Sequence, residues 1–194
     1  MTRWAPDAAL RLEQAAIELF EQQGYAATTV PQIAERAGLT TRTFFRHFVD
    51  KREVLFLRDR EFPEVVANAL AGLPDDLDPL SMVEQGLTAA TAPLQQWRAS
   101  ILRRRALIRS ESALHERELL KSANLSDAVA ASLRSRDVPP REARLLAALS
   151  VIVFDEALEA WLDADPGADL AAVLSTTWQA LRALSGGGAA RIHP

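Results

Sequence analysis

The stretch Thr28–Lys51, TTVPQIAERAGLTTRTFFRHFVDK, contains two short helical patterns on either side of a glycine. Either of its first two threonines can cap the first helix, and the proline in the first turn lacks an N–H that would be unpaired there. Gly38 ends this helix, and Thr40 caps a second one over residues 41–48. Helix, tight turn and helix at this length predict a helix-turn-helix, whose second helix fits the major groove of DNA.

The same stretch and the residue after it carry a basic edge. The whole chain has a net charge of −4, but residues 1–60 hold nine basic and eight acidic residues, whereas residues 61–194 hold 13 and 18. Phosphate groups sense charge within a Debye length of about 8–10 Å, so a local patch matters more than the total. A basic run is often only a solvated face, and its overlap with the two-helix pattern is what favours DNA as the partner. The basic residues are Arg36, Arg42, Arg46, Lys51 and Arg52, against one acid, Asp50.

The segment Gly24–Phe56, GYAATTVPQIAERAGLTTRTFFRHFVDKREVLF, resembles the DNA-binding domain of the TetR (tetracycline repressor) family. The matching features are GYxxTT, IAExAGL, RHF at the end of the second helix and K-x-x-x-L after it, in this order. The resemblance implies a bacterial homodimeric transcriptional regulator, most often a repressor. It also implies a double-stranded, pseudo-palindromic DNA operator and a small-molecule effector whose binding to the C-terminal domain releases that operator.

Two positions depart from the pattern of the family. The family often has tyrosine where this chain has Phe45, which removes a hydroxyl and a phosphate contact but leaves a ring that can touch a sugar or a thymine methyl group. The family often has glycine where this chain has Arg42, and arginine is the commonest bidentate reader of guanine. We therefore expect Arg42 to help set the preferred operator sequence.

The expected DNA contacts fall into two groups. Helix N-termini and side-chain donors position phosphates, whereas side chains on the groove-facing helix approach bases. A plain helix cap is the alternative role for Thr40, and partial core packing is the alternative for Phe45. The phosphate group comprises Thr29, Thr40, Thr41, His47 and Lys51, the base-reading group comprises Arg42, Thr43 and Phe45, and Arg46 completes the DNA-binding set.

Beyond the helix-turn-helix, apolar residues recur with helical spacing and no segment alternates as a strand does. We expect an all-α protein of about nine helices, with a DNA-binding domain over residues 1–50 and a helical effector-binding and dimerisation domain over 51–194. A helix over 141–163 is apolar almost all round, and one over 169–185 carries an apolar stripe. Such helices need partners, so the last two are expected to form a four-helix homodimer interface.

The effector site leaves a weaker trace in the sequence. Ligand pockets are mostly apolar with a few polar groups, but an aromatic residue on an apolar helix face is more often part of a core. The tract Arg103–Arg105 can bind an anion, although an outward helix face with one arginine turned towards an acid is the preferred interpretation. The candidate ligand-binding residues are Gln96, Trp97, His115, Phe154, Asp155 and Trp161.

Other function classes find no support in the sequence. The chain has no cysteine and only three scattered histidines, so we expect no metal site. No Ser-His-Asp arrangement or glycine-rich phosphate loop is present, so we expect neither enzymatic activity nor a cofactor. No apolar run reaches the roughly 18 residues of a membrane span, and no signal-peptide pattern begins the chain, so the cytoplasm is the expected location. The remaining alternative is a dimeric ligand- or partner-binding helical module without sequence-specific DNA binding.

Overall fold

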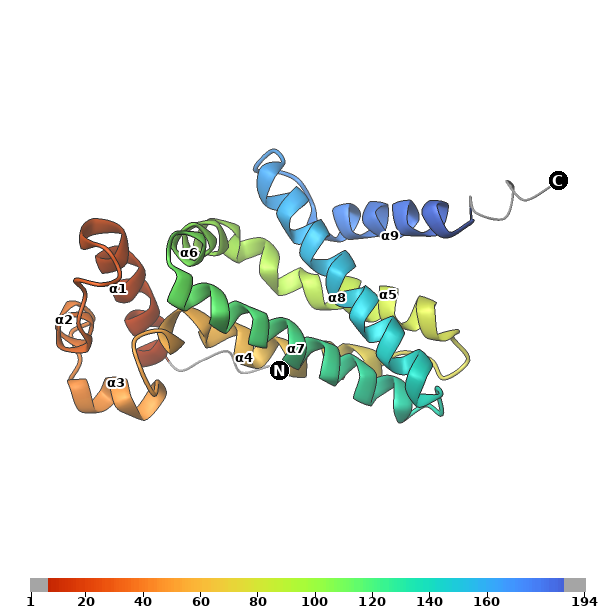
Figure 1. Cartoon of the computed structure of the whole chain (residues 1–194), viewed down its shortest axis with the longest axis horizontal. Coiled ribbons are helices and arrows are strands. Elements are labelled where there is room, and N and C mark those ends of the chain that lie inside the picture. Colours follow the sequence, from red (N-terminus) through yellow and green to blue (C-terminus); the bar gives the residue numbers. More distant parts are fainter. Residues whose placement is uncertain (1–6, 187–194) are drawn as a thin grey trace. The chain divides into compact units, whose positions relative to one another are not determined.

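The computed structural model describes residues 7–186, apart from the side chains of 7, 59–60, 113, 115–116, 119–120 and 185–186. The described residues form nine α-helices and two short 3₁₀ helices and contain no strand, which confirms the predicted all-α class (Figure 1). The α-helices are α1 (Asp7–Gln23), α2 (Val30–Arg36), α3 (Thr41–His47), α4 (Leu57–Ala71), α5 (Pro79–Thr91), α6 (Arg98–Ser110), α7 (Ser112–Arg134), α8 (Pro140–Asp163) and α9 (Leu170–Gly186), and the 3₁₀ helices are η1 (Glu53–Phe56) and η2 (Ala92–Trp97).

The chain folds into two compact units, and each unit is assembled from two separate segments. The first unit contains the residues up to Phe62 together with Ala99–Ser122, and the second contains Pro63–Arg98 together with the residues from Ala123 onward. The predicted domain boundary after residue 50 does not coincide with this division. It followed the end of the helix-turn-helix pattern, whereas η1 and most of α6 pack with that motif.

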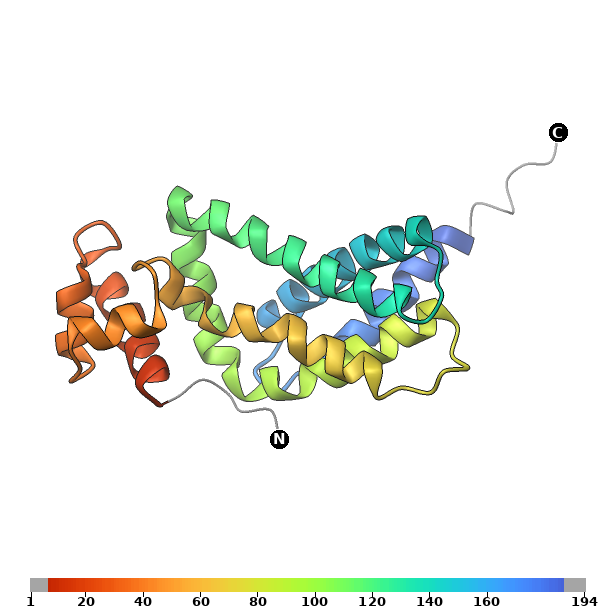
Figure 2. The same cartoon turned by 90° about the horizontal axis from the view of Figure 1, so that it is seen from below.

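The core of the first unit is rich in aromatic side chains. Phe20 of α1, Phe44 of α3 and Phe56 of η1 are all buried, and Ile108 of α6 completes the same cluster from far along the sequence. Helices α1, α2 and α3 lie together in both views (Figures 1 and 2). One face of α3 is thus fixed in a core to which distant parts of the chain contribute.

The second unit contains α5, α8 and α9, which lie together in both views (Figures 1 and 2). Trp161 of α8 and Trp178 of α9 have no exposed surface. The indole N–H of Trp161 donates to the carbonyl of Ala168 over 2.9 Å, and the Arg98 guanidinium donates to the carbonyls of Trp161 and Leu162 over 2.9 Å each. Hydrogen bonds from Trp161 and Arg98 therefore hold the end of α8 and the turn that leads to α9.

A close approach between α4 and α5 in the second unit depends on a glycine. A Cβ atom added at Gly86 of α5 would lie 2.3 Å from Cδ2 and 2.8 Å from Cγ of Leu70, whose side chain is fully buried. Real Cβ atoms do not come so near, and a buried leucine has little room to move in a close-packed interior. A side chain at position 86 therefore forces Leu70 or the backbone around it to shift.

We expect Gly86→Val to lower the free energy of unfolding by about 1–3 kcal/mol, because overpacking a filled contact forces side chains and backbone to shift. Urea denaturation followed by circular dichroism measures the change. Gly72→Val is the matched control, since a Cβ there would meet only backbone oxygens at 3.6 and 3.7 Å. Equal stability of the two variants would show that this contact is not tight.

Candidate nucleic-acid interface

The start of α3 is fixed by the turn that precedes it. Gly38 takes φ +64°, a left-handed conformation that favours glycine, and the backbone N–H of Leu39 donates to the carbonyl of Ala34 over 2.8 Å. The Thr40 hydroxyl then accepts the N–H of Thr43 over 3.1 Å as the N-cap of α3. Arg11 of α1 donates to the carbonyl of Ala37 and ties the turn to the first helix. The predicted glycine break and threonine cap are both confirmed.

The outward face of α3 combines apolar and cationic side chains. Phe45 is 56% exposed, and Arg42 and Arg46 are exposed beside it. The Phe45 ring meets Phe44 edge to face, with 5.5 Å between the centroids and 83° between the planes. Together with Thr43, these exposed side chains line a surface concavity of about 420 Å³. Partial core packing, the alternative for Phe45, is therefore present on one side of its ring, while more than half of the side chain faces solvent.

Thr29 caps the other helix of the motif. Its backbone N–H donates to Oε1 of Gln32 over 2.8 Å, and the N–H of Gln32 donates to the Thr29 hydroxyl over 3.5 Å, which forms a capping box. Both groups are exposed, so the N-terminus of α2 faces solvent with its cap in place. Thr41 and His47 are partly buried on α3, which leaves each of them some solvent-facing surface. The predicted DNA contacts of these residues remain predictions.

Lys51 has a structural role that the sequence did not suggest. Its ammonium donates to the carbonyls of Tyr25 over 2.7 Å and Thr28 over 2.9 Å, and it lies 4.2 Å from the centre of the Tyr25 ring. These contacts hold the loop between α1 and α2 against the segment that follows α3. An ammonium has three hydrogens to donate, and these bonds use most of them. The predicted phosphate contact of Lys51 would have to compete with them.

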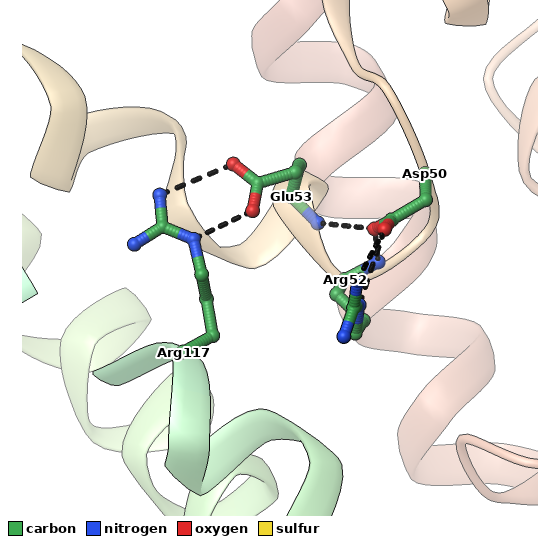
Figure 3. Close-up of polar contacts among 4 residues, drawn as sticks. All are labelled: Asp50, Arg52, Glu53 and Arg117. Carbon is green, nitrogen blue, oxygen red and sulfur yellow. Dashed lines mark hydrogen bonds and ion pairs between the residues drawn. The ribbon is translucent and has the colours of Figure 1, made fainter. Parts of the chain in front are cut away.

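The segment after α3 is anchored by two ion pairs (Figure 3). The Asp50 carboxylate accepts the N–H of Arg52 over 2.8 Å, that of Glu53 over 3.2 Å and the Arg52 guanidinium over 2.8 Å. Burial acts to raise the pKa of the Asp50 carboxyl, but the hydrogen bonds from Arg52 and Glu53 outweigh it and hold that pKa below its ordinary value. Glu53 in turn accepts Arg117 of α7 over 2.6 and 3.2 Å, so the end of the motif is joined to α7.

The arginine tract on α6 does not form the outward face that the sequence favoured. Arg104 and Arg105 are only 6% and 7% exposed, and Arg104 donates to the carbonyl of Leu55 over 3.2 Å. Arg103 forms a two-pronged pair with Glu21 of α1 at 2.8 and 2.5 Å. The hydrogen bond from Arg103 holds the pKa of the Glu21 carboxyl below its ordinary value. Hydrophobic spacing could not reveal this, because the acceptors lie about 50 to 80 residues away.

The candidate ligand-binding residues belong to both compact units. The backbone of His115 belongs to the first unit and its side chain lies outside the described part, whereas the other five residues belong to the second unit. Gln96 is exposed, and Trp97 and Asp155 are partly buried. Phe154 and Trp161 are buried, and Trp161 serves the turn after α8. The ligand-binding set therefore stays a prediction.

Metal-binding clusters and membrane-spanning helices are both absent from the described residues. No group of three or more His, Asp or Glu side chains in this part of the chain is placed to hold a metal ion. None of its helices is long and apolar enough to cross a membrane.

The fold and the exposed face of α3 define a helix-turn-helix protein. Residues 13–56 match the family described as "Bacterial regulatory proteins, tetR family", and the helix-turn-helix segment belongs to that family. The helix-turn-helix type transcriptional regulator TcmR of Streptomyces glaucescens is 40% identical over 79 residues, which cover 41% of this chain and 35% of TcmR. The regulator HbdR of Aromatoleum sp. (strain CIB) is 46% identical over 43 residues, which cover 22% of this chain and 19% of HbdR. The match thus spans well under half of either relative.

Solved structures share the fold over most of the chain. The fatty acid degradation regulator FadR from Bacillus halodurans has a TM-score of 0.53 and 19% identity, with 92% of this chain and 96% of that chain covered. FadR from Bacillus subtilis, solved with stearoyl-CoA, has a TM-score of 0.61 and 17% identity, with 89% and 96% covered. A complex of SmeT with triclosan has a TM-score of 0.58 and 19% identity, with 90% and 91% covered. The likeness at this identity is one of fold.

We expect Lys51→Met to lower the free energy of unfolding by about 1–3 kcal/mol, because the partly buried carbonyls of Tyr25 and Thr28 lose a charged donor. The slope of log K for DNA against log salt should stay unchanged in the folded variant. Arg46→Met is the matched control, with stability within about 0.5 kcal/mol of the parent and a reduced slope. A Lys51→Met protein of parental stability whose slope falls by about one would assign Lys51 to a phosphate instead.

Proposed function

We propose that this chain is a DNA-binding transcriptional regulator, acting as a repressor, that reads a duplex operator through α3. The observation that carries the proposal is the division of α3 into a face locked in the core by Phe44 and an opposite face that presents Arg42, Phe45 and Arg46. A helix presented in this way fits the major groove, which is about 12 Å wide. Membership of the helix-turn-helix segment in the tetR family supports the same function.

The proposed contacts follow from where each side chain lies. Arg42, Thr43 and Phe45 approach base edges, since they line the outward concavity of α3. The N-termini of α2 and α3 approach phosphates, since backbone N–H groups and the helix dipole favour anions there. Thr29, Thr40 and Thr41 belong to these termini, Arg46 and His47 extend the phosphate contacts along α3, and Lys51 acts by holding the preceding loop.

A homodimer through α8 and α9 is part of the proposal. Leu145, Leu149 and Ile152 are exposed at i, i+4 and i+7 on α8, and Ile152 is 64% exposed. Leu184 of α9 is exposed as well. A second copy of the chain is the occupant that fits, because a two-fold interface buries the same stripe on both copies. A dimer also presents two α3 helices to the two halves of a pseudo-palindromic operator.

A small-molecule effector completes the proposed regulator. The structures of Bacillus subtilis FadR with stearoyl-CoA and of SmeT with triclosan show that proteins of this fold bind organic ligands. In this chain the effector would bind the second unit and shift the population towards a dimer geometry that no longer fits the operator. Such a protein acts in the cytoplasm without catalysing a reaction, which is how we propose this chain works.

DNA binding is tested by selecting duplexes from a random library and measuring affinity by fluorescence anisotropy. We expect one sequence class to bind at least about 1000-fold more tightly than random DNA, with a steep salt dependence of about 0.9 per phosphate contact. Arg42→Ala should relax the preference at one base pair at a cost of about 1–3 kcal/mol. The absence of any preferred sequence at moderate salt would favour a binding module without sequence-specific DNA recognition.

The dimer is tested by sedimentation velocity of the purified chain. Ile152→Arg should convert the dimer into a monomer, because a charge placed within an apolar stripe that the dimer buries loses its hydration. Leu102→Arg is the matched control, since Leu102 is an exposed leucine of α6 outside the stripe, and this variant should stay dimeric. A parental chain that sediments as a monomer at micromolar concentration would contradict the proposed dimer.

A further inference from the structure

We infer that the concavity lined by Arg42, Thr43, Phe45 and Arg46 takes the 5-methyl group of a thymine, beside a guanine that Arg42 holds. The inference rests on the proposed DNA-binding function and deepens it, since it names two neighbouring bases of the operator. The concavity and its lining lie wholly on α3, in the first unit.

The Phe45 ring is a fixed apolar wall. It packs edge to face on Phe44, which has no exposed surface and packs in turn on Phe48 with 5.4 Å between centroids. More than half of Phe45 nevertheless stays in solvent, so its position is set before any ligand arrives. A phenyl ring has no donor or acceptor, and the apolar group that the floor of the major groove offers is the methyl group of thymine.

The two arginines beside the ring are available for a ligand. Within the part of the chain that the structure describes, neither Arg42 nor Arg46 forms an ion pair or a side-chain hydrogen bond. By contrast, Arg36, Arg52 and Arg103 are each paired with an acid. A free guanidinium on a groove-facing helix matches the O6 and N7 acceptors of guanine. Arg42 therefore makes the polar contact with guanine, and Phe45 makes the apolar contact with the methyl group of thymine.

The spacing of Arg42 and Phe45 along α3 places their contacts on adjacent bases. Arg42 and Phe45 are three residues apart on α3, so their Cβ atoms are about 5–6 Å apart. Successive bases of one strand are about 3.4 Å apart along the axis, so the two side chains address neighbouring positions. Sugars lie at the rim of the groove, whereas Phe45 lies on the outward face between two cations. The half-site therefore contains a thymine next to a guanine.

The test uses the full chain and the duplex obtained by the selection described above. Each thymine is replaced in turn by deoxyuridine, which removes only the methyl group, and affinity is measured by fluorescence anisotropy. We expect one position per half-site at which the wild-type affinity falls about threefold to fivefold, the equivalent of one buried methyl group. Phe45→Ala should bind the thymine and deoxyuridine duplexes equally, whereas Val49→Ala, another exposed apolar residue, should keep the difference.

The guanine is tested in the same way. Replacing the neighbouring guanine by 7-deazaguanine removes the N7 acceptor, and it should weaken wild-type binding but not binding by Arg42→Ala. Deoxyuridine duplexes that all bind wild type as the parent does would overturn the inference while leaving the proposed function intact. A deoxyuridine effect that persists in Phe45→Ala would overturn it too. A chain that selects no sequence would overturn the proposed function and the inference with it.

Discussion

The burial of Phe44 is the constraint on which the surface of α3 depends. A helix of seven residues cannot hold its own shape in water, because so short a helix gains too few hydrogen bonds to offset its nucleation. Phe44 and Phe48 fix one side of it in the core, and Thr40 fixes its first turn. Because the buried face of α3 is held in this way, the side chains on its exposed face point in a defined direction. The exposed face therefore depends on the packing of the buried one.

Cationic side chains provide a second layer of support around this short motif. Lys51 holds the loop before α2, Arg11 holds the turn before α3, and Arg117 holds the segment after it through Glu53. Each cation is directed at backbone carbonyls or a carboxylate within the first unit, and a phosphate contact would have to compete with these bonds. Within the basic edge seen in the sequence, Lys51 therefore contributes to support, whereas Arg42 and Arg46 are exposed and are the residues proposed to contact DNA.

Much of this could be predicted from local sequence, because caps, glycine turns and helical periodicity are local properties. The glycine break at Gly38 and the cap at Thr40 were both predicted and confirmed. The predicted pairing of one arginine of the 103–105 tract with an acid is also confirmed, by Arg103 and Glu21. The structural role of Lys51 and the burial of Arg104 were not predicted, because their partners lie 23 to 49 residues away in the chain. Charge in a sequence does not reveal whether a side chain faces a carbonyl or solvent. The effector site escaped for the same reason, since pockets are formed by distant residues.

The chain passes between its two compact units three times, after Phe62, after Arg98 and after Ser122. A fragment that ends at Phe62 would keep the helix-turn-helix but lose Ile108, Leu114 and Arg117, which cover its core and anchor its last segment. A single recombination event between two related genes would therefore join the helix-turn-helix of one protein to the α6 and α7 segments of another. Those segments would carry side chains that pack against a different helix-turn-helix. Exchange of DNA specificity between relatives is then easier by substitution on the outward face of α3 than by swapping whole domains.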